Sequence, residues 1–394
     1  MIVSHMSDLR MSDDTVRHAA VRPTPRSRIL TLLGGGQPDR VPWFGDLDYW
    51  ASALIGRGER PEGFKESTAY IDWHRSLGVG FYLQGYFPFR PVYDFEERLW
   101  RDGHRRYREL VTPRGTLREC WEYLPESFAE APIEHLVKSE DDLPALRYAY
   151  AHTHWEPDYA FGQRRLNDIG DQGILLCYLP KSPFMHLVAL EAGIAAVTYA
   201  EAADPDGFAE TLAVMKESFD RAAQLAIDSP AEVLMIPENL SAEMIGPRFF
   251  EKYMRAYQEE WTGRLAAAGK HSFIHMDGTL KGLLREEASV GFTVIEAMTP
   301  APVGDLAIEQ WAAQAGASRS VLWGGIPGVY FTAKVSDEEF DRHVADVLSV
   351  MRSTPRYVLG VADQVPPDAL ESRVRRVEEL VDRFGKYDTG TRTF

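Results

Sequence analysis

Cysteine is nearly absent from this sequence: its 394 residues include only Cys120 and Cys177. Two cysteines cannot form a disulfide framework or a zinc site built mainly from thiolates. No apolar run approaches the roughly 18 residues that a membrane-spanning helix requires. The N-terminus also lacks the basic, apolar and cleavage segments of a secretion signal. These absences predict a protein of the reducing cytoplasm with no membrane partner.

Basic residues are in deficit, with 43 Lys and Arg against 59 Asp and Glu, a formal net charge of −16 at pH 7. Binding to nucleic acid requires a basic surface that releases counterions, and an acidic chain does not supply one. A composition of 45% hydrophobic and 26% charged residues is ordinary for a folded globular protein. We therefore expect a small-molecule partner and no nucleic acid.

The sequence has no internal repeat, no low-complexity tract and no long linker that would divide it. We predict a single domain over residues 27–388, preceded by a loose polar arm over residues 1–26. A short helix over Pro25–Leu33 should end at the glycine run 34–36. This glycine run precedes the first predicted strand instead of following it, which argues against a nucleotide-binding open sheet.

Eight apolar segments read as strands, and helical segments separate most of them; they begin near residues 41, 79, 173, 232, 272, 292, 320 and 357. Such alternation implies parallel pairing with helical crossovers. The prediction is an α/β fold, a (β/α)8 TIM barrel with an N-terminal helical extension. Alternating residues between Arg98 and Tyr123, with turns at Asp102-Gly103 and Pro113-Arg114-Gly115, predict a β-hairpin insertion. Its arginines read as a solvated strand face or as an anion clamp.

The segment Phe273–Gly278 is the centre of the functional prediction. It is an apolar strand that ends in His275, Asp277 and a glycine. Residues two apart on a strand share a face, so this imidazole and this carboxylate can converge on one ligand. A lone histidine in such a strand is commonly a core residue. The same kind of polar ending recurs on other predicted strands, which favours a site.

In a barrel, all strands direct their carboxyl ends at one mouth. The polar residues expected there are Asp46, Asp48, Gln84, Tyr86, Tyr178, Glu238, Asn239, His275, Asp277, Glu296 and Asp363. Several carboxylates around one imidazole suit a bound cation or acid–base catalysis. For Asp48 and Asp363, capping of the following helices is the alternative.

Three segments, together with the His275 strand, resemble the uroporphyrinogen decarboxylase superfamily: Gly324–Pro327, Gly304-Asp305 and Gly360–Asp368. The resemblance covers about residues 30 to 385. This superfamily also contains corrinoid- and thiol-dependent methyltransferases, and it is similar to the barrel of cobalamin-independent methionine synthase. The resemblance implies the same barrel fold and an enzyme.

The residues discriminate between two branches of that superfamily. True decarboxylases have an N-terminal Arg-Gln-Ala-Gly-Arg signature that neutralises the carboxylates of their substrate. The corresponding first-strand region here reads Trp43–Asp48 and contains two acids, Asp46 and Asp48. Acids at this place would repel a polyanionic porphyrinogen. The decarboxylase is therefore the alternative function, and a methyl or alkyl transferase is preferred.

The methyltransferase branch holds zinc with a His-x-Cys pair, a glutamate on the next strand and a distal cysteine. The resemblance assigns His275 and Glu296 to two of these positions, with Asp277 and Asp363 at or near the two cysteine positions. We expect these four residues to bind a divalent metal, with zinc preferred. Oxygen donors leave the metal a stronger Lewis acid than thiolates do.

Several further residues are predicted to act on or contact the substrate. Glu238 is expected as a further ligand or general acid, and Asp46 and Tyr86 as catalytic groups. The substrate is expected to contact Trp43, Asp48, Trp50, Gln84, Asn239 and Trp323. Tryptophan faces can bind a quaternary ammonium or a sulfonium through cation–π contacts.

Three questions stay open: whether the enzyme uses a metal, which acceptor it uses, and whether the protein is catalytic. A metal-free methyltransferase would use the acidic mouth to bind a cationic donor and pass the methyl group to a corrinoid on a separate protein. The acceptor of the metal-assisted enzyme is a thiol or a corrinoid. A non-catalytic binding protein on the same fold is the third alternative, and the family resemblance implies a homodimer.

Overall fold

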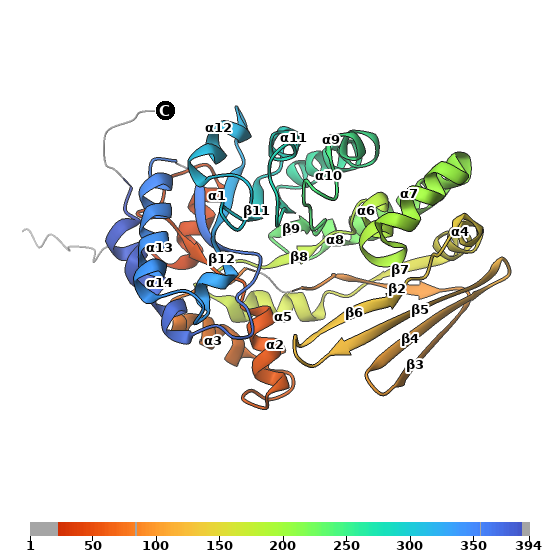
Figure 1. Ribbon diagram of the computed structural model, residues 1–394, viewed down its shortest axis with the longest axis horizontal. Helices are drawn as coiled ribbons and strands as arrows, with labels where there is room; N and C mark the ends of the chain where they lie inside the picture. The colour runs from red at the N-terminus through yellow and green to blue at the C-terminus, as the bar shows by residue number, and fades with distance from the viewer. Residues whose placement is uncertain (1–22, 83–84, 355, 388–394) are drawn as a thin grey trace, which may run out of the picture.

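The centre of the molecule is a curled parallel sheet (Figure 1). This computed structural model describes residues 23–82, 85–354 and 356–387. Seven strands are paired in the order β1-β13-β12-β11-β10-β9-β8. Their bounds are β1 Trp43–Phe44, β8 Leu176–Tyr178, β9 Val233–Ile236, β10 His271–His275, β11 Val294–Met298, β12 Val321–Pro327 and β13 Tyr357–Ala362.

The segment predicted as the second strand lies between the two edges of this sheet. Isolated parallel bridges join Gly80 to Phe44 of β1 and Phe81 to Gly173, just before β8. The Ile174 amide donates to the carbonyl of Phe81 at 3.0 Å. A Cβ on Gly173 would lie 1.8 Å from that carbonyl oxygen, so the approach requires glycine. Seven of the predicted strands are thus paired in one sheet, and the eighth segment is bonded to both edges.

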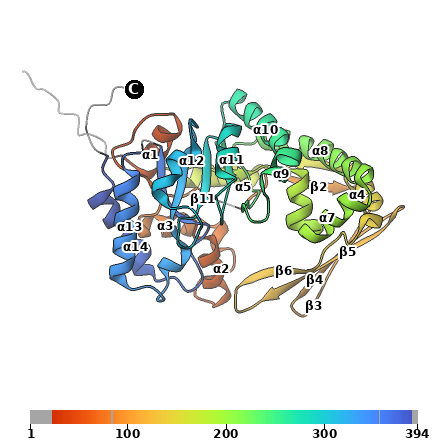
Figure 2. The ribbon, with the colours of Figure 1, turned by 45° about the horizontal axis from the view of Figure 1, so that its top comes forward.

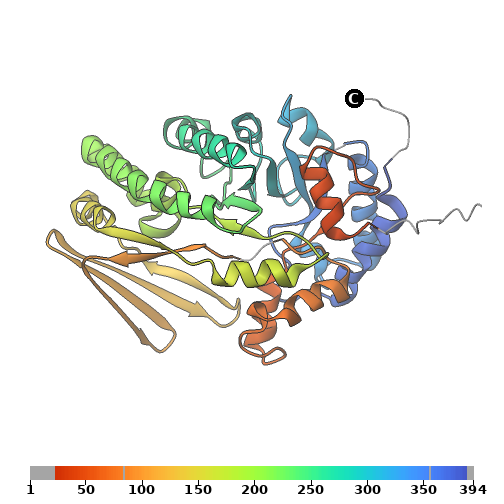
Figure 3. The same cartoon turned by 180° about the vertical axis from the view of Figure 1, so that it is seen from behind.

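The concave side of the sheet is filled by its own side chains. The period of two predicted for parallel strands holds, since alternate residues such as Phe273 and His275 point inward. The inner core is made of Ile29, Leu32, Leu33, Phe44, Tyr82, Ile174, Leu176, Val233, Met235, Phe273, Val294, Val321, Trp323 and Val358. Its first three members belong to α1 (Pro25–Leu33), the short helix predicted from the sequence. Helix α1 therefore packs on the inner core, and Figure 3 shows it on the back of the molecule.

Most of the helices that follow α1 cover the outer side of the parallel sheet, and a few lie beside the antiparallel insertion (Figure 2). They are α2 Asp48–Gly56, α3 Thr68–Leu77, α4 Leu143–Ala151, α5 Ala160–Ile169, α6 Pro183–His186, α7 Gly193–Ala203, α8 Pro205–Asp228, α9 Pro247–Phe249, α10 Arg255–Ala267, α11 Leu284–Val290, α12 Trp311–Ala315, α13 Asp337–Met351 and α14 Glu371–Phe384. Two π-helical turns, at Leu187–Glu191 and at Phe250–Met254, lie directly before α7 and α10. None of the helices in the described part of the chain has the length and apolar character needed to cross a bilayer.

The predicted hairpin insertion is a separate antiparallel sheet that extends from the side of the molecule (Figure 1). Its strands are β3 Glu96–Asp102, β4 Arg105–Thr112, β5 Gly115–Leu124 and β6 Ala129–Glu134. The two predicted turns join β3 to β4 and β4 to β5. A further antiparallel pair, β2 Phe89–Tyr93 and β7 Thr153–Pro157, was not predicted, because the sequence between 141 and 168 reads as helix and loop.

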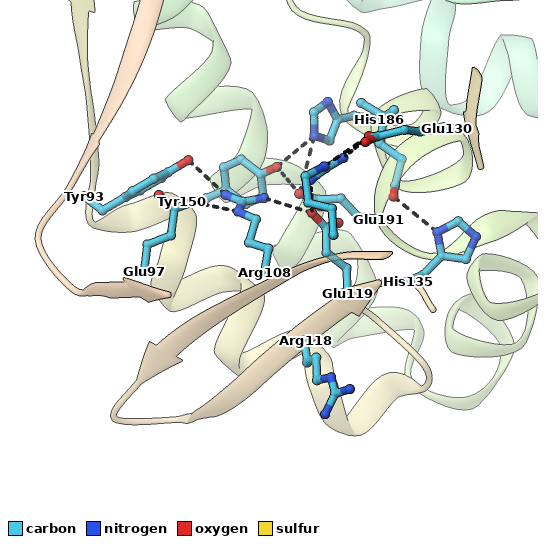
Figure 4. Close-up of polar contacts among 12 residues, drawn as sticks. Tyr93, Glu97, Arg108, Arg118, Glu119, Glu130, His135, Tyr150, His186 and Glu191 are labelled. Carbon is cyan, nitrogen blue, oxygen red and sulfur yellow. Dashed lines mark hydrogen bonds and ion pairs between the residues drawn. The ribbon is translucent and has the colours of Figure 1, made fainter. Parts of the chain in front are cut away.

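Two groups of polar contacts lie where this insertion faces the helical layer, one on the strands and one on the helices (Figure 4). Arg108 donates through Nε to Glu97 at 2.7 Å and through Nη2 to the hydroxyl of Tyr93 at 2.9 Å. On the facing helices, the Tyr150 hydroxyl donates to Glu191 Oε1 at 2.5 Å and lies 3.0 Å from Nε2 of His186. Arg108 is thus neither on a solvated face nor free to clamp an anion.

Candidate active site at the carboxyl ends of the strands

His275, Glu296 and Tyr82 form a hydrogen-bonded chain across three segments of the sheet. His275 on β10 and Glu296 on β11 are register partners. Nδ1 of His275 donates to Glu296 Oε2 at 2.7 Å, and the Tyr82 hydroxyl donates to Oε1 of the same carboxylate at 2.7 Å. The Glu296 side chain is 1% exposed. Both of its oxygens are therefore occupied, and the imidazole is held in one orientation.

The free ring nitrogen of His275 faces two further carboxylates. Nε2 lies 3.6 Å from Asp363 Oδ1 and 3.9 Å from Asp277 Oδ1. One donor atom from each of these three residues lies within 4.8 Å of the others. This is the convergence expected from the two-residue period for His275 and Asp277. Asp363 joins them from β13, on the far side of β11 and β12.

Backbone strain marks the same end of the sheet. Four non-glycine residues in the described part of the chain have positive φ, and three of them end strands: Asn239 at 56°, Ala297 at 67° and Asp363 at 69°. Such conformations are costly and persist where the surrounding structure imposes them, commonly at functional sites. Asp363 is followed by a long loop, and Leu370 is the N-cap of α14. The capping alternative for Asp363 is therefore wrong.

Electrostatics in the cluster favour a charged imidazole when no cation is bound. Burial opposes that charge, but the adjacent Glu296 carboxylate, aided by Asp277 and Asp363, raises the pKa of His275 to about 9. Burial, together with the charges of Asp277 and Glu296, raises the pKa of Asp363 to about 6, against the opposing effect of His275. A cation bound among these groups would replace the proton on Nε2 and the proton that Asp363 tends to take up.

Asp46 and Asp48 lie beside this cluster and are tied to the protein. Asp46 is buried; it accepts from the Asp48 amide at 2.8 Å and from Nε2 of Gln364 at 2.9 Å. Burial and the charges of Asp48 and Asp363 raise the pKa of Asp46 well above its usual range. Asp48 begins α2 but makes no cap, because Leu47 is the N-cap; it pairs with Lys65 at 3.0 Å. The capping alternative for Asp48 is thus wrong as well.

Glu238 lies in a different buried environment. Its carboxylate accepts from the Ser182 amide at 3.1 and 3.3 Å, at the turn after β8. Burial raises its pKa, and the neighbouring Lys181 opposes that rise. Lys181 also donates to the carbonyl of Pro237 and to Oδ1 of Asn239, the latter at 3.4 Å. Glu238 therefore fixes the turn that carries Lys181. Burial lowers the pKa of Lys181, and the charges of Glu238 and Asp277 oppose this effect.

The predicted aromatic residues pack away from the cluster. Trp43 stacks on Phe331, with ring centroids 6.4 Å apart, and Trp50 lies 4.9 Å from Trp73. Trp323 belongs to the inner core, with its ring 4.6 Å from that of Tyr82.

Two further predicted residues, Tyr86 and Gln84, come from the end of the second predicted strand. Tyr86 packs on Phe161 of α5, its hydroxyl has no partner among the described residues, and burial raises its pKa to about 12. Gln84 lies outside the described residues.

Four residues of the site were not singled out from the sequence as acting residues: Tyr82, Tyr178, Lys181 and Gln364. Burial raises the pKa of Tyr178 well above its usual range, and the charges of Asp46 and Glu296 add to this effect. Tyr178 therefore lies close enough to Asp46 and Glu296 for their charges to affect its hydroxyl. A usable signal was present for Tyr82, because it stands two residues before the predicted site residue Gln84 and residues two apart on a strand share a face.

No thiol replaces the cysteines that the family resemblance leads one to expect. Cys120 and Cys177 are both free and buried. Cys120 lies in the insertion on β5, and burial raises the pKa of Cys177 on β8 to about 12. A thiolate is the metal-binding form of cysteine, so neither residue suits that role. In the described residues the donors at this site are one imidazole and carboxylates.

Comparison with known proteins identifies the family. The family model described as "Uroporphyrinogen decarboxylase (URO-D)" matches residues 182–384, just over half of the chain. The chain belongs to this family. The matched segment contains His275, Asp277, Glu296 and Asp363, whereas Asp46 and Tyr82 lie outside it.

Solved structures support the fold of this URO-D protein. A methyltransferase from Methanosarcina mazei superposes with a TM-score of 0.59 at 14% sequence identity. The similarity covers 92% of this chain and 99% of the archaeal one. At this identity the likeness shows the fold alone. A search of curated proteins gives no match.

Proposed function

We propose that this URO-D family protein is a metal-assisted methyl or alkyl transferase whose metal is held by His275, Asp277 and Asp363. The observation that supports the proposal most strongly is the placement of three donor atoms within 4.8 Å of one another at the ends of β10 and β13. Donors around a four-coordinate zinc ion stand about 3.3 Å apart. The distances of 3.6 and 3.9 Å from His275 Nε2 require only small movements.

In this proposal Glu296 orients the histidine and does not bind the metal directly. Its hydrogen bond to Nδ1 at 2.7 Å fixes the tautomer that leaves Nε2 free for coordination. This differs from the role first expected for Glu296, because both of its oxygens already accept hydrogen bonds. Tyr82 holds the other oxygen, so the orienting carboxylate is itself fixed.

A divalent cation bound here would lower the pKa of a thiol acceptor or polarise the leaving group of a methyl donor. The acidic groups around it then define the substrate. Asp46, Asp48 and Asp363 would attract a cationic donor and repel a polyanionic porphyrinogen. Lys181, beside Asp277, is placed to balance one negative charge. This distribution favours the transferase over the decarboxylase.

The other predicted residues take supporting roles in this proposal. Glu238 positions the Lys181 turn, and Asn239 contacts the same lysine. Trp43, Trp50, Trp323 and Tyr86 support the walls of the site. We also propose that the sheet closes into the full eight-stranded barrel through the segment that contains Gly80 and Phe81.

The metal-free alternative has one observation in its favour. Without a cation, the carboxylates around His275 raise its pKa to about 9, so the site at neutral pH would hold an imidazolium among acids. Such a site can bind a small cationic methyl donor directly. A corrinoid on a separate protein would then be the acceptor.

The experiment measures metal and activity on the same preparations. Purified protein, His275→Ala and Asp363→Asn are stripped with a chelator and titrated calorimetrically with Zn2+. We expect one equivalent to bind the unmodified protein and at least about a hundredfold weaker binding in either variant, the usual effect of losing one ligand. His271→Ala is the matched control, because His271 lies at the opposite end of the same strand.

Activity decides between the two forms of the proposal. Demethylation of quaternary ammonium, sulfonium and methyl ether donors is assayed with a thiol or cob(I)alamin as acceptor. Turnover that requires zinc supports the metal-assisted enzyme. Turnover by stripped protein supports the metal-free form. Full zinc binding by both site variants would remove the metal role of these residues.

A further inference from the structure

A large cavity lies at the end of the sheet opposite the His275 cluster. It has a volume of about 1400 Å³ and opens at the amino ends of β11 and β12, where Thr293 and Ser320 line it. The glycine run 34–36 after α1, the end of α11 and the loop 315–320 form its other walls. None of the described residues that line it is acidic. It cannot share ligands with the site at the opposite strand ends.

Three arginines line this cavity, which we name the arginine pocket: Arg285, Arg319 and Arg356. Arg356 donates through Nη2 to the carbonyl of Ser318 at 3.0 Å. For Arg285 and Arg319, no hydrogen bond or ion pair is found within the described ranges. By contrast, Arg255 pairs with three carboxylates and Arg376 with two. In a chain of net charge −16, three unneutralised guanidinium groups in one cavity leave a local positive field.

Two of the three arginines, Arg319 and Arg356, are close enough for the charge of one to affect the other. Burial lowers the pKa of Arg356, and the positive charge of Arg319 lowers it further. Like charges gathered in one cavity repel, and an anion between them removes that cost. Guanidinium groups also match phosphate geometry through paired N–H donors.

Backbone acceptors lie beside these cations. Gly34, Gly291 and Gly316 follow the last residues of α1, α11 and α12, so the carbonyl ends of three helices border the pocket. Such carbonyls carry partial negative charge. Those of Leu30, Leu32 and Ala315 already accept one hydrogen bond from a following amide, which leaves each oxygen one lone pair for a further donor. They would oppose a bare anion but would accept hydrogen bonds from hydroxyl or amine groups. At Gly291 and Gly316, a Cβ would point into open space.

We propose that the arginine pocket binds a phosphorylated small molecule of the nucleoside diphosphate class. Its phosphates would lie on Arg285, Arg319 and Arg356, and its hydroxyl and amine groups on the helix carbonyls. The volume of about 1400 Å³ admits a ligand of this size. The proposal is independent of the transferase activity, since the pocket shares no residue with the His275 cluster.

The test is calorimetric titration of the full chain with ADP and, separately, with inorganic pyrophosphate. We expect ADP to bind with a Kd below about 1 mM and to bind more tightly than pyrophosphate, because only ADP offers donors to the helix carbonyls. Arg285→Gln combined with Arg319→Gln should weaken ADP binding about a hundredfold through the loss of two charge-assisted contacts. Arg356 is left in place because it holds the Ser318 carbonyl.

A second double variant controls for the change in net charge. Lys334→Gln combined with Arg342→Gln also removes two exposed cations, and neither residue forms an ion pair in the part of the chain that the structure describes. ADP binding should be retained in this protein. Failure of ADP to bind, equal affinity for pyrophosphate, or equal loss in the two double variants would each overturn the proposal. Thermal unfolding of each variant confirms that it is folded.

Discussion

Replacing Glu296 by glutamine should abolish a pH-dependent part of the stability of the metal-free protein. The variant keeps the shape of the side chain but removes its charge. A carboxylate accepts from both His275 Nδ1 and the Tyr82 hydroxyl, whereas an amide oxygen can satisfy only one of them well. The imidazole then stays buried without its counter-charge, so its pKa should fall below the ordinary value of 6.5.

The magnitude follows from the pKa of His275, which the carboxylates raise from 6.5 to about 9 in spite of burial. At about 1.4 kcal/mol per pKa unit, this shift corresponds to roughly 3 kcal/mol of folding free energy. Because the folded-state pKa is the higher one, this stabilisation is complete below pH 6.5 and is lost as the pH rises through 9. The His275 side chain is only 13% exposed, so little of it is screened by solvent.

The assay is urea unfolding of chelator-treated protein at intervals from pH 6 to pH 10. Other groups titrate in this range, including Glu287, whose pKa burial raises to about 8. The informative quantity is therefore the difference in unfolding free energy between Glu296→Gln and the unmodified protein. It should be about 3 kcal/mol near pH 6 and shrink by more than half at pH 10. Glu309→Gln, at an exposed position, is the control.

Two results would refute this reasoning. One is a difference in stability between the two proteins that does not change with pH. The other is an NMR titration in which the pKa of His275 stays near 9 in Glu296→Gln. Either result would mean that Glu296 is not what holds the imidazole in its charged form.

Three further predictions concern other parts of the molecule. Asp363→Asn should remove zinc binding and stabilise the metal-free protein above pH 6 by up to about 1 kcal/mol. The pKa of this carboxyl is raised to about 6, so its charge opposes folding at higher pH, although the effect is small because the group is partly exposed and screened; asparagine also tolerates the φ of 69°. Lower stability in urea unfolding at pH 8 would contradict this. Tyr150→Phe should lower the free energy of unfolding by about 2 kcal/mol, because it leaves the buried carboxylate of Glu191 without its hydroxyl donor. Unchanged thermal unfolding would show that the polar contacts of Tyr150 in Figure 4 do not contribute to stability. Gly173→Ala should cost more than about 3 kcal/mol of unfolding free energy, because its Cβ would lie 1.8 Å from the Phe81 carbonyl oxygen. The control, Gly263→Ala on the exposed face of α10, should stabilise the protein by about 0.5 kcal/mol or more. Equal, small effects of the two substitutions in urea unfolding would show that segment 79–82 does not pack against β8.

The strand ends were predictable because they depend on a period that the sequence contains. Residues two apart share a strand face, so His275 and Asp277 could be placed together without knowledge of the fold. The short helix that ends at Gly34 was equally local, since glycine commonly ends helices. The turns of the insertion were predictable from their glycines for the same reason.

Features that depend on register or on depth in the core were not predictable. That Glu296 lies opposite His275 depends on the pairing of β10 with β11, which no local pattern encodes. The sequence therefore placed Glu296 among the metal ligands and could not show its hydrogen bonds to Tyr82 and His275. The packing of Trp323 on Tyr82 is likewise a tertiary feature, and so is the stacking of Trp43 on Phe331.

The central claim is that one imidazole and two carboxylates at the ends of β10 and β13 hold a metal without any sulfur ligand. X-ray absorption spectroscopy of the zinc-loaded protein tests this directly, because Zn–S distances are about 2.3 Å and Zn–N or Zn–O distances about 2.0–2.1 Å. The account predicts a single shell at the shorter distance, one histidine in the scattering pattern, and loss of both in His275→Ala. A sulfur shell, or a spectrum unchanged in His275→Ala, would contradict it.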